Sequence, residues 1–194
     1  NKKMIKNCLI INCTCKDDTI ALKINNKFFF KKLQTNIIKY EALSLVVLDF
    51  IKEHNVKIDQ KFSILVNSGP GSFSGIRIAL AVTKGIQIVK RLNIYSYNNF
   101  TLNAAPHLKK TETLISIIKT NNFHYYSERN PSKNLKFTAP KKLDSNCLEM
   151  DNSLLIFSQE LENDEIIKKA DPKKVCIAKF DLKNIDILIN KNLL

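Results

Sequence analysis

Short apolar runs separated by turn-forming residues occupy the first part of the chain. Residues 7–15 form a strand-like run, residues 16–18 give a turn signal, and residues 19–24 form a second alternating run. Residues 25–26 are both asparagine, which tolerates positive φ and therefore predicts a tight turn before a third strand over residues 27–33. Three consecutive strands joined by short turns predict an antiparallel meander.

A helical spacing of apolar residues follows over residues 40–54. Leu45 and Leu48 fall outside its main apolar stripe. Two interpretations stay open for them, a wide helix that faces the core throughout, or a second apolar face that meets a partner. The main stripe consists of Leu43, Val46, Val47, Phe50 and Ile51.

The next segment has the pattern of a strand, a glycine-rich loop, a helix and a strand, over residues 62–67, 68–75, 76–92 and 93–97. A unit of this length predicts a right-handed parallel crossover. The helix has a broad apolar side made of Ile78, Ala81, Val82, Gly85, Ile86 and Val89. The opposite side holds Arg77, Thr83, Lys84, Gln87 and Arg91, with Ile76 and Leu80 stranded among them.

A short helix over residues 98–105 and a polar break at residues 106–111 suggest a boundary between lobes. The expected lobes are therefore residues 1–105 and a smaller lobe over residues 106–194. In the second lobe the pattern predicts a hairpin (113–120 and 123–128, turning at Asn121-Asn122), a loop (130–142), strands (154–157 and 175–178) and a helix (159–170).

One motif carries chemical information, the run Ser68-Gly69-Pro70-Gly71-Ser72-Phe73-Ser74-Gly75-Ile76-Arg77. Its glycines allow positive φ and a close approach of backbone, and Ser72 or Ser74 can cap the helix that follows. Exposed amides at a helix start attract anions, so phosphate binding is one interpretation. A tight strand-to-helix connection is the other, because the run fits neither a Walker loop, G-x-G-x-x-G nor a G-x-S-x-G elbow.

The chain has a formal net charge of +13, nearly all of it from lysine. Such a charge is typical of proteins that bind nucleic acid, because lysines displace counterions from phosphates. An AT-rich coding sequence explains it as well, since asparagine and isoleucine are also abundant and arginine occurs only at positions 77, 91 and 129. Both explanations stay open.

Catalytic and metal-binding constellations are not evident in the sequence. His54, His107 and His124 are isolated, and no pair of carboxylates is placed for acid and base work. Cys13 and Cys15 share one face of a predicted strand and are either small buried residues or two metal ligands. Without a long apolar run or a secretory leader, we expect a cytoplasmic protein with no membrane partner.

The segment NSGPGSFSGIRIALAVTKGI resembles the GPGSFTGLR segment and following helix of the bacterial TsaB (YeaZ) family. The resemblance extends over about residues 5–105. It implies an α/β protein with the actin-like ATPase (ASKHA, ribonuclease-H-like) fold, whose first lobe runs β-β-β-α-β-α-β-α and whose second lobe is reduced. Lys39-Tyr40-Glu41 keeps only the glutamate of the family's His-Ser-Glu run.

The resemblance also implies a role in making threonylcarbamoyladenosine next to the tRNA anticodon. In that family the protein is a non-catalytic subunit that pairs with TsaD, while the ATPase TsaE joins them, and tRNA is met through the complex. ATP and metal then belong to the partner subunits, so no cofactor is expected in this chain. Asn12 is consistent with this expectation, because it is neutral at a position where active actin-like ATPases carry an acidic residue.

The family pairs through its first two helices, and the isolated chain has the option of pairing with itself. The resemblance therefore implies a partner interface that includes Glu41, Leu45, Leu48, Ile76 and Leu80.

Two other functions remain as alternatives. The glycine-rich loop alone supports an autonomous peptidase or nucleotide hydrolase, and the lysine content supports a tRNA-binding module that needs no protein partner. Turnover by the isolated chain distinguishes the first of these, and salt-dependent binding of tRNA without partners distinguishes the second.

Overall fold

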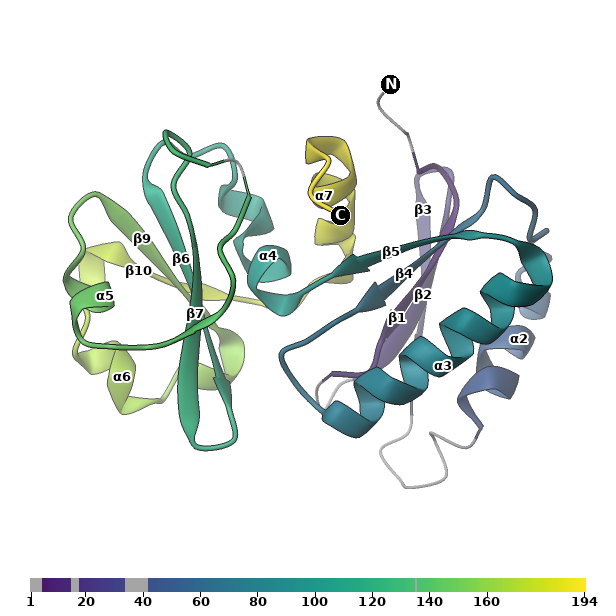
Figure 1. Cartoon of the computed structure of the whole chain (residues 1–194), viewed down its shortest axis with the longest axis horizontal. Helices are drawn as coiled ribbons and strands as arrows, with labels where there is room; N and C mark the ends of the chain where they lie inside the picture. Colours follow the sequence, from purple (N-terminus) through teal and green to yellow (C-terminus); the bar gives the residue numbers. More distant parts are fainter. Residues whose placement is uncertain (1–4, 15–17, 34–41, 135) are drawn as a thin grey trace. The chain divides into compact units, whose positions relative to one another are not determined.

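The structure is a computed structural model that describes residues 5–14, 18–33, 42–134 and 136–194. The chain divides into two compact units, residues 1–98 and residues 99–193, with Leu194 grouped with the first. Each unit is built on its own five-stranded mixed sheet with helices packed against it (Figure 1). No helix among the described residues combines the length and the apolar character needed to cross a membrane.

The sheet of the first unit has the strand order β3-β2-β1-β4-β5. The meander is confirmed, because β1 pairs antiparallel with β2 and β2 with β3. The parallel crossover is also confirmed, since β4 pairs in parallel with both β1 and β5. The strands are β1 (Cys8–Asn12), β2 (Thr19–Ile24), β3 (Lys27–Lys32), β4 (Ser63–Asn67) and β5 (Asn93–Tyr97).

Two helices, α2 (Leu43–Glu53) and α3 (Phe73–Lys90), share the core of the first unit. They contact each other and lie side by side in Figure 1. The side chains that they bury pack on those of β1, β2 and β4. Their opposite faces therefore point away from this core.

The sequence places several residues of α3 on the wrong side, since Ala81 and Gly85 of its predicted apolar side are also exposed. Thr83 is fully buried although it was predicted on the polar side, and Val89 is 76% exposed although it was predicted on the apolar side. The residues that α3 buries most deeply are Gly75, Ala79 and Thr83, which are small and four positions apart. Small side chains let the helix approach the sheet closely, so the buried face follows size rather than hydrophobicity alone.

The sheet of the second unit has the strand order β10-β9-β6-β7-β8. The predicted hairpin is confirmed, because β6 and β7 pair antiparallel across a turn where Asn121 has a φ of 54°. β9 pairs in parallel with β6 and β10. The strands are β6 (Thr113–Thr120), β7 (Phe123–Arg129), β8 (Lys141–Lys142), β9 (Ser153–Ser158) and β10 (Val175–Ala178).

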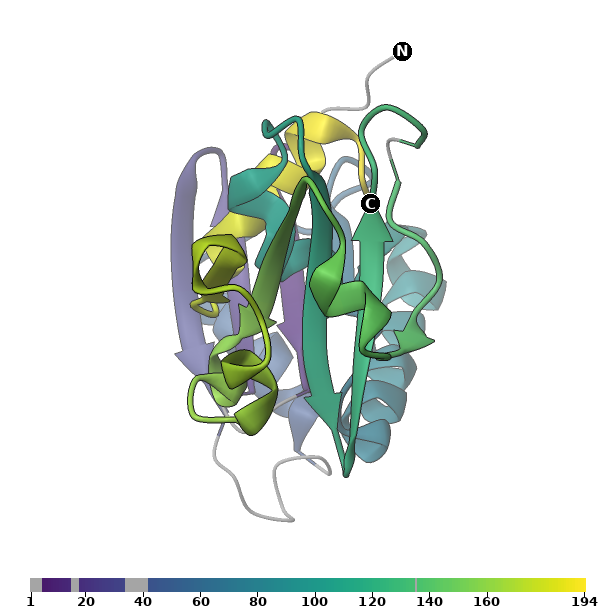
Figure 2. The ribbon, with the colours of Figure 1, turned by 90° about the vertical axis from the view of Figure 1, so that its left-hand side faces the viewer.

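Helical segments cover the second sheet. α4 buries Phe100 and Leu102 and contacts β6 and β9, so it lies in the second unit, whereas the sequence analysis grouped it with the first lobe. α5 and α6 lie in front of the strands in Figure 2. The segments are α4 (Asn99–Ala104), α5 (Asn146–Glu149), α6 (Glu165–Lys168), α7 (Ile185–Lys191) and the 3-10 turns η1 (Ala105–His107), η2 (Gln159–Leu161), η3 (Pro172–Lys174) and η4 (Leu182–Asn184).

The single helix predicted over residues 159–170 is wrong. The chain forms η2, and then α6 begins separately, because the Asp164 carboxylate accepts a hydrogen bond from the Ile166 amide at 3.1 Å. Side chains of this type favour such caps over the interior of a helix. The helix α7 near the end of the chain was not predicted.

Candidate functional site

The glycine-rich loop joins β4 to α3 and passes close to the end of β1. Gly69 has a φ of 98°, which side-chain-bearing residues rarely adopt, and its peptide bond to Pro70 is cis. Gly71 lies against Thr14, and a Cβ at Gly71 would be 2.1 Å from the Thr14 carbonyl oxygen. The Ser72 amide donates to that same oxygen at 2.9 Å. Both glycines are therefore needed for this path of the backbone.

Three buried polar side chains connect the loop to the sheet. The side-chain amide nitrogen of Asn67 donates to Asn12 Oδ1 at 2.7 Å and to Thr14 Oγ1 at 3.3 Å. The Thr14 hydroxyl donates to the same Asn12 oxygen at 2.9 Å. Asn67 Oδ1 in turn accepts a hydrogen bond from the Gly69 amide at 2.9 Å. Residues that end β1 and β4 thus tie the loop to the sheet, and we call Asn12, Thr14 and Asn67 the amide network.

Several backbone amides of the loop and of the first turn of α3 are engaged within the chain. Ser72 caps the helix, because its hydroxyl accepts from the Gly75 amide at 3.2 Å and its carbonyl from the Ile76 amide at 2.9 Å. Together with the bonds from the Gly69 and Ser72 amides, these contacts direct the donors inward. These contacts fit the interpretation of the loop as a tight strand-to-helix connection, and phosphate binding stays the other interpretation.

The outward side of the loop carries an exposed aromatic ring. Phe73 is 72% exposed, and the Arg77 guanidinium lies over its ring at 5.6 Å from the centroid. Ser72 and Ser74 are exposed as well, whereas Gly75 is buried against the core. The loop therefore presents Phe73 and Arg77 at its surface, and both belong to the first turns of α3.

The predicted interface residues of α2 and α3 lie at the surface. Leu45 is 64% exposed, Leu48 is 52% exposed and Leu80 is 38% exposed, while Ile76 is half-buried. Leu45 and Leu48 are thus not core residues, which excludes the wide core-facing interpretation of α2. Glu41 lies outside the described residues.

Two further apolar side chains, Phe73 and Ile88, extend this exposed face. Ile88 is 78% exposed and lies eight positions after Leu80, on the same side of α3. The sequence analysis names Phe73 only as a residue of the glycine-rich loop and does not single out Ile88, although the helical spacing of positions 73, 80 and 88 is a usable signal. We call Leu45, Leu48, Phe73, Leu80 and Ile88 the outer apolar surface.

No cluster of three or more histidine, cysteine or acidic side chains suited to a metal ion occurs among the described residues. Cys13 is buried in the core of the first unit, and Cys15 lies outside the described residues. His54 has a structural position, since Nδ1 is 3.0 Å from the Phe50 carbonyl oxygen and its ring is 4.5 Å from that of Phe29.

A thiol and an imidazole meet in the second unit. Cys176 Sγ of β10 lies 3.4 Å from His107 Nε2 of η1, and both side chains are half-buried. Burial and the nearby Lys110 ammonium lower the pKa of His107, so its imidazole is neutral at neutral pH and can accept from the thiol. The pair has the residue types of a nucleophile and its base.

Asp164 at the start of α6 forms an ion pair with a lysine of β6. Lys119 Nζ is 2.8 Å from Asp164 Oδ2, and this hydrogen bond is the main reason that the pKa of Asp164 falls from 3.8 to about 2. Burial opposes the shift, while the Ile166 amide and His124, whose Nε2 is 3.2 Å from the same oxygen, reinforce it. The depressed pKa means that the pair stabilises the folded state above about pH 4.

We therefore expect the second unit to lose stability as the pH falls from about 4 to about 2, where Asp164 takes up its proton. Lys119→Met should flatten this part of the profile. Urea unfolding at a series of pH values measures it, with Lys133→Met as control because Lys133 is an exposed lysine of the same unit. Equal pH profiles for Lys119→Met and the unmodified chain would contradict the assignment.

Comparisons with known proteins extend beyond the loop. No protein-family model matches the chain. The protein named tRNA threonylcarbamoyladenosine biosynthesis protein TsaB from Buchnera aphidicola subsp. Baizongia pistaciae is 27% identical over 135 residues, which cover 66% of this chain. The match spans 60% of that protein, less than two thirds of its length.

Solved structures show the same architecture. YeaZ from Pseudomonas aeruginosa superimposes with a TM-score of 0.69 at 14% identity, covering 95% of this chain and 91% of YeaZ. A Bacteroides thetaiotaomicron protein with an actin-like ATPase fold and unknown function gives a TM-score of 0.53 at 10% identity, covering 97% of each chain. At these identities the likeness concerns the fold.

The fold class is therefore confirmed as the actin-like α/β fold, with a mixed five-stranded sheet in each unit. The similarity in sequence to the TsaB protein, combined with this fold, also confirms the resemblance that the glycine-rich loop indicates. The chain is similar in sequence to a TsaB protein and in fold to YeaZ.

Proposed function

We propose that this chain is a non-catalytic subunit of the machinery that installs threonylcarbamoyl on adenosine next to the tRNA anticodon. In this role it pairs with TsaD, supports the binding of TsaE, and works in the cytoplasm, where tRNA is modified. ATP and metal are held by the partner subunits. The name of the Buchnera relative, a tRNA threonylcarbamoyladenosine biosynthesis protein, supports the pathway.

The observation that carries the proposal is the outer apolar surface. Four of its five side chains are at least half exposed, and they come from two helices that contact each other. Exposed apolar groups gathered in this way mark interaction sites in soluble proteins. A second subunit that covers Leu45, Leu48 and Leu80 would remove them from water, and Phe73 with Arg77 would extend the contact to the loop.

The loop supports the same role. The polar groups of the amide network and the Ser72 cap form hydrogen bonds that hold the backbone of the loop. Asn12 has a carboxamide, whereas a site that organises a metal ion uses a carboxylate. A rigid strand-to-helix joint keeps the first turns of α3, with Phe73, Arg77, Ile76 and Leu80, in a fixed position. Such a joint suits docking of a partner.

Copurification tests the pairing. A tagged form of this chain, mixed with TsaD, should retain it at about 0.15 M and 0.5 M salt, because apolar contacts are not screened. Addition of TsaE and tRNA should then yield threonylcarbamoyladenosine only when this chain is present. Failure to retain TsaD at either salt concentration would refute the pairing.

The alternative of an autonomous hydrolase has one specific contact in its favour, the Cys176–His107 pair. A structure described as similar to peptidase YEAZ from Pseudomonas aeruginosa has a TM-score of 0.67 at 12% identity, covering 94% of this chain and 89% of that one. Peptide or ATP turnover by the isolated chain, abolished by Cys176→Ala, would replace the proposal above with this one.

A further inference from the structure

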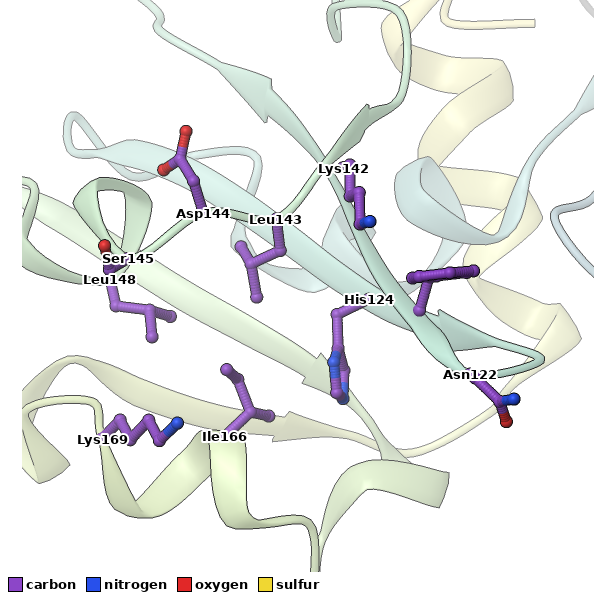
Figure 3. Close-up of a pocket in the computed structure, with 10 residues that line it drawn as sticks. Asn122, His124, Lys142, Leu143, Asp144, Ser145, Leu148, Ile166 and Lys169 are labelled. Atoms are coloured by element: carbon purple, nitrogen blue, oxygen red, sulfur yellow. The ribbon is translucent and has the colours of Figure 1, made fainter.

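An open pocket of about 230 Å³ lies in the second unit beside the turn of the β6–β7 hairpin (Figure 3). Its floor is apolar and consists of Leu143, Leu148 and Ile166. The His124 ring stands beside this floor, and its backbone carbonyl accepts from the Leu143 amide at 2.9 Å. Strand β7, β8 with the segment that follows it, and the helices α5 and α6 together build the pocket, which we call the hairpin pocket.

Two ammonium groups and one carboxylate line the hairpin pocket, those of Lys142, Lys169 and Asp144. Lys142 and Lys169 line the pocket from different sides, and the Lys142 ammonium lies over the Phe123 ring at 4.1 Å from its centroid. The Asp144 carboxylate points away from His124 (Figure 3). Asp144 is engaged by the Cys147 amide at 3.1 Å. Neither lysine forms an ion pair with any described residue, whereas the neighbouring Lys119 and Lys141 pair with Asp164 and Glu128.

The lining combines an apolar floor, an imidazole face and two ammonium groups whose charge is not neutralised by an ion pair. A flat, weakly polar ring fits between floor and imidazole, and an anion attached to that ring meets the lysines. The volume is smaller than that of sites enclosing drug-sized ligands, so the pocket has room for one ring rather than a whole ligand.

We propose that the hairpin pocket binds one unpaired nucleotide of an RNA strand, with the base on the floor beside His124 and the flanking phosphates at Lys142 and Lys169. The inference rests on the proposed function, which brings the chain to tRNA, and it adds a direct contact by this subunit. The net charge of +13 attracts the strand in a general way, and the pocket selects an unstacked base.

Binding of a fluorescent single-stranded RNA hexamer to the full chain tests the proposal. The double variant Lys142→Gln/Lys169→Gln should bind about tenfold more weakly near 0.1 M salt. Its slope of log affinity against log salt should be shallower by about 1.4, roughly 0.7 for each lost phosphate contact. The matched control is Lys168→Gln, which removes an exposed lysine that neighbours Lys169 but does not line the pocket.

The base contact is tested by changing the RNA instead of the protein. An abasic hexamer should bind the unmodified chain about tenfold more weakly than the ordinary hexamer. In the double variant the same removal of bases should have a smaller effect, because base and phosphates occupy one site. A duplex of the same length should bind no better than the abasic strand.

Several outcomes overturn the inference. If Lys168→Gln weakens RNA binding as much as the loss of a pocket lysine does, the effect comes from general charge and not from the pocket. Equal affinity for the abasic and ordinary strands would also contradict a base contact. An acidic peptide that binds with the same dependence on Lys142 and Lys169 would assign the pocket to a protein partner. The double variant should still retain TsaD. A loss of RNA binding with TsaD retained concerns this inference alone, whereas failure of the unmodified chain to retain TsaD concerns the proposed pairing.

Discussion

Gly71→Ala is expected to destabilise the first unit by about 3 kcal/mol or more, because the new methyl group would be 2.1 Å from the Thr14 carbonyl oxygen. The opposing atom belongs to the backbone and cannot rotate away. Relief requires the loop to move away from β1, which also breaks the 2.9 Å hydrogen bond from Ser72 to Thr14. Thermal unfolding followed by circular dichroism should show a transition lowered by roughly 10 °C or more.

Gly85→Ala is the matched control, since it adds the same methyl group inside α3, the helix that follows the loop. A Cβ at Gly85 meets nothing within 4 Å, and alanine has the higher helix propensity. This variant should therefore be unchanged or more stable by up to about 1 kcal/mol. If Gly71→Ala were as stable as Gly85→Ala, the close approach of the loop to Thr14 would be wrong.

Leu48→Asp is expected to weaken pairing with TsaD by roughly 3 to 5 kcal/mol, because the proposed interface would bury an unpaired carboxylate. Folding of the chain itself should change little, since Leu48 is 52% exposed and exposed positions tolerate substitution. The dissociation constant for TsaD, measured by calorimetry or by retention on tagged chain, should rise by more than a hundredfold.

Lys57→Gln controls for charge in this experiment, because it also lowers the net charge by one unit, at an exposed residue outside α2 and α3. Its pairing should match that of the unmodified chain. Equal loss of affinity in both variants would point to long-range charge rather than contact. Undiminished pairing by Leu48→Asp would place the interface elsewhere, even if TsaD binds.

The sequence predicts the first unit well because its signals are local. Alternating runs end at Asn25-Asn26, and Asn25 indeed has a φ of 55°, so β2 and β3 occur where the pattern places them. β5 and the β6–β7 hairpin follow for the same reason, since a period of two between two turn signals leaves little freedom. The composition of the loop also indicates the family without help from the structure.

Packing between distant segments explains what the sequence does not give. Which side of α3 is buried depends on how closely Gly75 and Ala79 approach the sheet, so hydrophobicity alone misplaces Thr83 and Val89. The break between η2 and α6 depends on one cap by Asp164, which competes with a continuous helix. Local propensity cannot decide between such alternatives when tertiary contacts contribute as much to the free energy of folding.

In the candidate site, too, local features were predicted from the sequence and contacts between distant segments were not. The loop residues were found from sequence, but the amide network was not, because Asn67 and Thr14 are 53 positions apart and meet only through the pairing of β1 with β4. The exposure of Leu45 and Leu48 was one of two open interpretations, and only the packing of α2 on β1, β2 and β4 decides it. The hairpin pocket had no sequence signal, since its lining comes from four separate segments.

The chain has only four glycines, and three of them, at positions 69, 71 and 75, lie in the loop or in the first turn of α3. Elsewhere among the described residues, left-handed positions are held by five asparagines and one arginine, at φ values between 51° and 55° for Asn25, Asn55, Arg91, Asn121, Asn152 and Asn192. Asparagine can serve there because that region admits a Cβ at modest strain. It cannot serve at Gly69, whose φ is 98°, or at Gly71, where the space is filled. Asparagine in place of glycine is thus tolerated at the ordinary turns of this protein, but steric clashes exclude it from the joint before α3.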